Sequence, residues 1–77
     1  MKVIEDTLIN NERTFVTVED ISTLDEGKVV IKSLALLTMI ELSKLPFDTL
    51  LKYQISICEE YVSVDCPNGD WLEYYIE

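Results

Sequence analysis

The last 17 residues, YVSVDCPNGDWLEYYIE, constrain the fold more than any other segment, because two alternating strands flank one turn. A three-residue loop over residues 67–69 pairs Val64 with Leu72, so that apolar side chains share one face. A loop of two or four residues would mix apolar and charged side chains on both faces. Pro67 favours the first turn position, and Gly69 suits the left-handed conformation of a G1 bulge. The segment is therefore predicted to form a β-hairpin.

The two faces of this hairpin predict different roles. One face carries Val62, Val64, Leu72, Tyr74 and Ile76, which we expect to pack against helices. The other face carries Ser63 and the six residues of the predicted partner-binding site: Tyr61, Asp65, Trp71, Glu73, Tyr75 and Glu77. Aromatic side chains supply contact area at interfaces, and acids select a basic partner. The alternative is that the rings only stabilise the hairpin through cross-strand pairs.

A second hairpin is predicted at the N-terminus. Residues 2–9 and 13–21 are rich in Val, Ile, Thr and Phe, and the polar residues Asn10-Asn11-Glu12 lie between them as a turn. The register stays open. A three-residue loop would place Ile4, Leu8, Val16 and Val18 on one face and Val3, Ile9, Phe15 and Ile21 on the other.

The middle of the chain is predicted to be helical. Thr23 and Glu26 match a capping box, which begins a helix over about residues 24–45. A strand over residues 28–32 followed by a helix over residues 33–45 is the alternative, because residues 29–31 are β-branched. In both cases residues 34–45 are apolar nearly all round, which predicts a place at the centre of the core. Pro46 ends this helix, and the apolar spacing that follows predicts a second helix over residues 47–60.

These elements predict an α+β fold for residues 1–77 as one small domain. An N-terminal and a C-terminal β-hairpin form an antiparallel sheet that packs on two central helices, in the order ββααββ. The first residues lack the charged-then-apolar order of a signal peptide. The longest apolar run, residues 29–40, is too short to cross a membrane. We therefore expect a cytoplasmic protein.

The charge of the chain favours a basic partner. Fifteen acidic and six basic residues, with no histidine, give a net charge of −9. Nucleic acids and anionic membranes would repel such a chain, so we expect no direct contact with either. The acids gather at both ends of the chain, because residues 28–58 hold only two of them, beside four bases. The expected partner is a protein with a basic surface, such as a nucleic-acid-binding surface.

The sequence contains no catalytic or metal-binding motif. It has no nucleophile motif and no glycine-rich phosphate loop, and adjacent acids on a strand point to opposite faces. Residues 65–70 lack the ligand spacing of an EF-hand. Cys58 and Cys66 form no CxxC pair and are expected to be reduced. We therefore expect a protein that is not an enzyme and that binds no metal or cofactor.

A short, acidic α+β chain without an active-site motif is similar in general character to the small inhibitor proteins that phages deploy against host enzymes or defence systems, anti-CRISPR proteins among them. The resemblance is one of composition and transfers no residues. It implies a protein-binding module that inhibits its partner by occupying a basic surface. Three alternatives stay open: a nucleic-acid mimic, an antitoxin or immunity-type protein, and an oligomeric scaffold subunit, such as a homodimer, that self-associates through the aromatic face.

Overall fold

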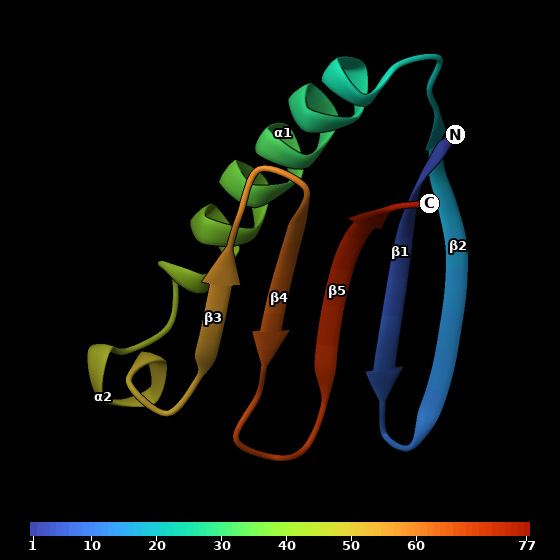
Figure 1. Ribbon diagram of the computed structural model, residues 1–77. Coiled ribbons are helices and arrows are strands. Elements are labelled where there is room, and N and C mark those ends of the chain that lie inside the picture. The colour runs from blue at the N-terminus through green and yellow to red at the C-terminus, as the bar shows by residue number, and fades with distance from the viewer.

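The computed structural model describes residues 1–77 as a five-stranded antiparallel sheet with one long helix on one face (Figure 1). The elements are β1 (Lys2–Ile9), β2 (Glu12–Asp20), α1 (Leu24–Leu42), α2 (Phe47–Leu50), β3 (Gln54–Ile57), β4 (Tyr61–Asp65) and β5 (Trp71–Ile76). The strand order is β2-β1-β5-β4-β3, so the first and last strands of the chain pair in the middle of the sheet. None of the helices is long and apolar enough to span a membrane. The α+β class is confirmed, and the ββααββ arrangement is only partly matched.

The C-terminal hairpin has the predicted register. Val64 pairs with Leu72, and Val62 pairs with Tyr74. The backbone N–H of Cys66 donates to the carbonyl of Asp70 at 2.8 Å, which closes the loop around residues 67–69. Gly69 has a φ of 95°, a conformation that is strained for any residue with a Cβ atom. The three-residue loop is therefore confirmed.

The N-terminal hairpin turns through two residues rather than three. Asn10 and Asn11 have φ values of 53° and 65°, as a type I′ turn requires, and Glu12 already belongs to β2. Ile9 consequently pairs with Glu12, and Leu8 pairs with Arg13. The face expected from a three-residue loop is wrong. Ile4 pairs with Thr17 while Glu5 pairs with Val16, so Val16 lies on the opposite face from Ile4.

Helix α1 begins where the capping box predicted. The hydroxyl of Thr23 accepts a hydrogen bond from the backbone N–H of Glu26, and the Glu26 carboxylate accepts one from the N–H of Ser22. The helix is continuous to Leu42, so the alternative strand over residues 28–32 is wrong. Gly27 lets this helix approach the sheet closely. A Cβ atom there would lie 2.7 Å from the terminal methyl groups of both Ile21 and Ile76.

The predicted second helix over residues 47–60 is wrong beyond its first turn. Helix α2 covers only Phe47–Leu50, and the chain then forms the short strand β3, Gln54–Ile57. The segment QISI alternates polar and β-branched residues, which favours a strand over so short a window. Ile55 pairs with Val64, and Ile57 pairs with Val62. Pairing with β4 therefore overrides the helical spacing that the sequence suggested.

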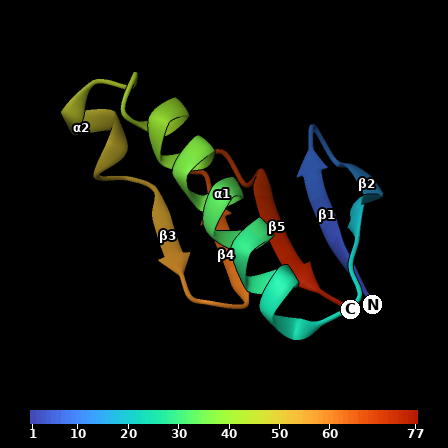
Figure 2. The same cartoon turned by 90° about the horizontal axis from the view of Figure 1, so that it is seen from above.

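The core lies between α1 and the central strands. Val3, Val62 and Val64 from the sheet pack with Ile31 and Ala35 from the helix, and Ile21 joins this cluster. One helix is about 10 Å wide and five strands span roughly 20 Å, so α1 cannot cover the whole sheet. Figure 2 shows α1 crossing the middle strands, with β2 and β3 to either side.

The outer side of α1 is not covered by any other part of the chain (Figure 2). Ile31, Ala35 and Thr38 are buried on its inner side, whereas large apolar residues on its outer side, such as Leu36 and Ile40, are exposed. The prediction that residues 34–45 lie at the centre of the core is therefore wrong for half of the helix surface. Only 10 of the 77 residues are buried.

Candidate functional site

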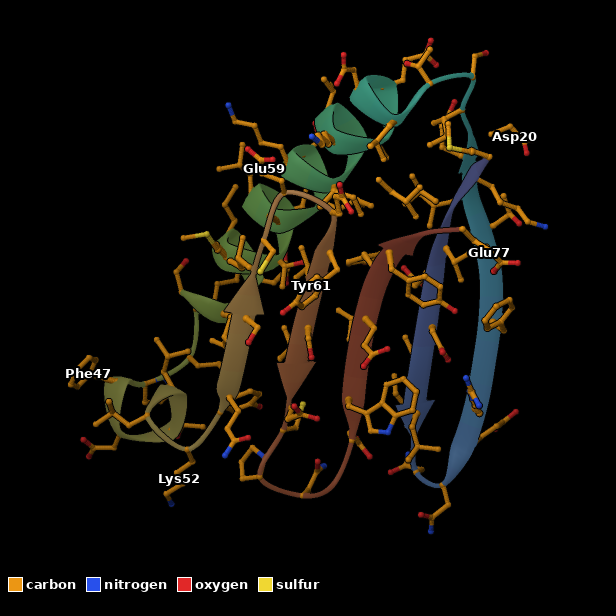
Figure 3. All side chains as sticks on the ribbon, in the orientation of Figure 1. Asp20, Phe47, Lys52, Glu59, Tyr61 and Glu77 are labelled. Carbon is orange, nitrogen blue, oxygen red and sulfur yellow. The ribbon has the colours of Figure 1, made fainter.

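The face of the sheet that α1 does not cover, here called the open face, gathers the predicted binding residues. Figure 3 looks onto this face. Strand pairing arranges its side chains in three rows across β2, β1, β5 and β4: Thr17, Ile4, Tyr75 and Tyr61; Phe15, Asp6, Glu73 and Ser63; Arg13, Leu8, Trp71 and Asp65. Each row therefore joins residues from both ends of the chain.

Five of the six predicted residues lie in these rows. Trp71, Glu73 and Tyr75 come from β5, and Tyr61 and Asp65 come from β4. Glu77 follows β5, and its backbone N–H still donates to the carbonyl of Lys2 at 2.8 Å. Alternation along the strands predicted that these aromatic and acidic side chains share one face, and the sheet brings them together there. Their role in binding a partner stays a prediction.

A buried acid on β1 was missed from the sequence. Asp6 is only 3% exposed, yet it lies on the open face between Phe15 and Glu73. The guanidinium of Arg13 donates from Nε to Asp6 Oδ1 at 2.9 Å and from Nη2 to Oδ2 at 2.7 Å. These hydrogen bonds to Arg13 hold the pKa of Asp6 below its ordinary value, against the opposing effect of burial. The same pairing raises the pKa of Arg13.

Two contacts bridge β1 from its neighbouring strands. The rings of Phe15 on β2 and Tyr75 on β5 have centroids 6.5 Å apart, and the Arg13 guanidinium carbon lies 5.8 Å from the Trp71 ring centre. Because β1 lies between β2 and β5, these pairs meet above it. Ile4 on β1 is accordingly only 1% exposed. This half of the open face is a packed layer of aromatic rings and one ion pair.

The other half of the open face is hollowed and acidic. A depression of about 420 Å³ lies over β3, β4 and β5 and is lined by Ser56, Glu60, Tyr61, Val62, Ser63, Glu73, Tyr74, Tyr75 and Ile76. Tyr61 and Tyr75 are directly paired across the strands, and Ser63 is paired with Glu73. Two carboxylates and no basic side chain line the depression. We call it the acidic depression.

Tyr61 and Tyr75, the tyrosines of the acidic depression that lie on the open face, keep their protons over a wide pH range. A hydrogen bond with Cys58 raises the pKa of Tyr61 above its ordinary value. Burial, and then the charges of Asp6 and Glu77, raise the pKa of Tyr75. Both hydroxyls therefore stay neutral at physiological pH and can donate or accept hydrogen bonds.

One sequence signal could have revealed the missed half of the site. Asn10 and Asn11 both tolerate a left-handed conformation, which favours a two-residue turn. That turn places Asp6 opposite Phe15 and Leu8 opposite Arg13. The pairing of β1 with β5, in contrast, joins segments more than 60 residues apart, and no local pattern predicts it.

Neither a metal site nor a disulfide is formed. No group of three or more Cys, Asp or Glu side chains is placed to hold a metal ion. Cys58 and Cys66 are free thiols, with Cys58 exposed and Cys66 partly buried. Burial, and then the nearby charges of Asp70 and Asp65, raise the pKa of Cys66. This makes the Cys66 thiol a poor nucleophile.

Comparison with known proteins adds no relative to these observations. No protein-family model matches the sequence, and no match was found among curated proteins or among solved structures.

Proposed function

We propose that the protein is a binding module whose open face occupies a basic surface of a partner protein. The acidic depression carries this proposal. It combines Glu60 and Glu73 with the two exposed or half-exposed rings of Tyr61 and Tyr75, and no base of the same chain lines it. Arg13, the nearest basic residue along the rows, is already held by Asp6.

The chemistry of the depression suits an arginine side chain. A guanidinium group donates to carboxylates in a fixed planar geometry and stacks on aromatic faces. In the depression, Glu73 and Glu60 supply the carboxylates, Tyr61 and Tyr75 supply the rings, and Ser63 supplies a further acceptor. A lysine would receive the same charge attraction without the planar match. We therefore propose arginine as the preferred basic residue of the partner.

Occupation of a basic surface gives a direct route to inhibition. Basic surfaces of proteins commonly bind nucleic acids or acidic substrates, and a bound acidic module would compete with them. We propose inhibition as the outcome of binding, in line with the resemblance in composition to phage-type inhibitors. Close imitation of a DNA duplex is less suited to this face, because Arg13 neutralises Asp6 and β5 carries only one acid, Glu73.

The proposal is tested by titrating the ¹⁵N-labelled protein with an arginine-rich peptide, a lysine-rich peptide and a neutral peptide of equal length. We expect amide shifts centred on Ser56, Ser63 and Glu73, and tighter binding of the arginine-rich peptide. Glu73→Lys should weaken binding at least about 10-fold, because it places a basic charge beside the incoming one. Tyr61→Ala should also weaken binding, since it removes one of the two rings.

The control is Glu12→Lys, which changes the net charge equally but lies at the start of β2, outside the depression. It should have a much smaller effect on peptide affinity than Glu73→Lys. Equal effects of the two variants, or shifts spread evenly over the molecule, would show that only the overall negative charge attracts the peptide.

A further inference from the structure

The outer side of α1 presents a large apolar surface to solvent. Its large apolar residues, which we call the outer α1 face, are Val29, Leu36, Leu37, Met39 and Ile40, and they are between 51% and 65% exposed. Val29, Leu36 and Ile40 lie within about 40° of one another around the helix axis. Five such residues expose on the order of 500 Å², at the upper end of the largest apolar patches that monomers show.

The chain as a whole exposes more surface than a compact monomer of its size. Its accessible surface is 5291 Å², whereas a compact monomer of 8.9 kDa exposes about 4800 Å². The apolar surface of β3 contributes to this excess, because Ile55 and Ile57 are 39% and 43% exposed. The chain itself therefore supplies no full cover for the outer α1 face or for the apolar side chains of β3.

The charge distribution singles out the same region for contact between copies. Residues 24–52, which form α1, α2 and their connection, hold four acids and four bases and are neutral. The whole net charge of −9 therefore falls on the rest of the chain. Two copies that approached through the open face would bring acids together, whereas this helical layer brings together surfaces without net charge.

We propose that the outer α1 face binds the same face of a second copy, in a two-fold symmetric dimer with the two α1 helices antiparallel. Glu26 lies in the first turn of α1, and Lys44 lies two residues beyond its last residue, where it forms an exposed ion pair with Glu41 at 3.0 Å. With the two-fold axis near Leu36, Glu26 of each copy faces Lys44 of the other. Apolar area makes up about 65% of dimer interfaces, so roughly 500 Å² corresponds to about 800 Å² per partner, the size of a standard interface.

Sedimentation equilibrium of the full chain from about 1 to 500 µM tests this dimer. We expect the mass to rise from 8.9 kDa to twice that value over this range. Leu36→Glu places two carboxylates beside the two-fold axis and should weaken dimerisation at least about 100-fold. Lys44→Glu should also weaken it, because it places acids of both copies together at each end of the dimer.

The matched control is Thr17→Glu, which adds the same charge on the open face and should leave the dimer intact. Circular dichroism at low concentration checks that each variant folds. A chain that stays monomeric to 500 µM would overturn the proposal and leave the outer α1 face to a different partner. A dimer that survives Leu36→Glu but is lost in Trp71→Ala would also overturn it, because self-association would then use the open face.

Discussion

At the scale of single residues, Asp6 shows how a charge is tolerated under a layer of rings. Its carboxylate is nearly inaccessible, but both of its oxygens accept hydrogen bonds from one guanidinium group. A bidentate pair of this kind fixes both side chains and leaves no buried oxygen without a partner. Arg13 in turn covers the Trp71 ring. One acid on β1 therefore orders an arginine on β2 and a tryptophan on β5.

Protonation of Asp6 at low pH should remove the stabilising contribution of its pair with Arg13, over a predictable pH range. The pKa of Asp6 is lower in the folded protein than in the unfolded chain, where it is about 3.9. Its contribution to stability is therefore complete above about pH 4 and is lost as the pH falls through the folded pKa. Asp6→Asn should lower the melting temperature at pH 7 and flatten the loss of stability below about pH 4. Thermal melts from pH 2 to 7 measure both effects.

Asp65→Asn provides the comparison for this pH experiment. Asp65 lies on the same face but is exposed. Its replacement should have a much smaller effect on the melting temperature at pH 7. It should also have a much smaller effect on the loss of stability below about pH 4. If the two variants behaved alike, the hydrogen bonds to Arg13 would contribute nothing beyond a surface charge.

At the scale of secondary-structure elements, the sequence predicted best where one pattern had a single solution. In the C-terminal hairpin, only a three-residue loop separates apolar from charged side chains, and the observed pairing of Val64 with Leu72 follows. Residues 54–57 are too few to distinguish a strand from a helix by periodicity, and pairing with β4 decides between them. Five residues of the candidate site followed from the hairpin alone. The turn at Asn10-Asn11 brings Asp6, Arg13 and Phe15 together locally, but their position beside β5 required the pairing of distant strands.

Helix α1 illustrates a limit of a different kind. Its residues are apolar nearly all round, which normally indicates a buried helix. The pattern indicates that the helix can pack against other elements on both sides. It does not indicate whether those elements belong to the same chain. Here the sheet covers one side and leaves Leu36, Leu37 and Ile40 exposed.

Helix α1 covers β5 but not β3, and this difference can be tested by truncating one apolar side chain on each strand. Leu72 and Ile55 both lie on the helix side of the sheet, but only Leu72 packs against the core that α1 covers. Leu72→Ala should therefore lower the free energy of unfolding by about 2 kcal/mol, at the lower end of the range for core truncations because Leu72 is half-buried. Ile55→Ala should cost less than about 1 kcal/mol. Urea unfolding at low micromolar protein concentration compares the two.

A larger loss from Ile55→Ala than from Leu72→Ala would contradict this arrangement. It would mean that the packing of β3, and not the packing of β5 against α1, contributes more to the stability of the fold in solution. Repeating the measurement at high protein concentration also reports on self-association, since the proposed dimer would bury the outer α1 face and raise the stability of every variant that still dimerises.

At the scale of the whole molecule, the two sides of the sheet differ in charge and in polarity. The open face is acidic and aromatic, while the helical layer is neutral and its outer face is apolar. The two proposed interactions therefore depend on different forces. Binding of a basic partner is attractive at long range, whereas two copies that each carry −9 repel one another until their apolar surfaces meet.

Salt should consequently change the two affinities in opposite directions. Raising sodium chloride from about 50 to 500 mM shortens the screening length from roughly 14 to 4 Å. Affinity for the arginine-rich peptide should fall about 10-fold or more, and Glu73→Gln should make that affinity less dependent on salt. Dimerisation should stay constant or strengthen several-fold, because screening removes the repulsion between the two copies and leaves apolar contact unaffected, and this outweighs the weakening of the exposed Glu26–Lys44 pairs. Peptide titration and sedimentation equilibrium at both salt concentrations measure the two responses. A parallel weakening of both would mean that self-association is itself driven by charge, and therefore that it does not take place through the neutral helical layer.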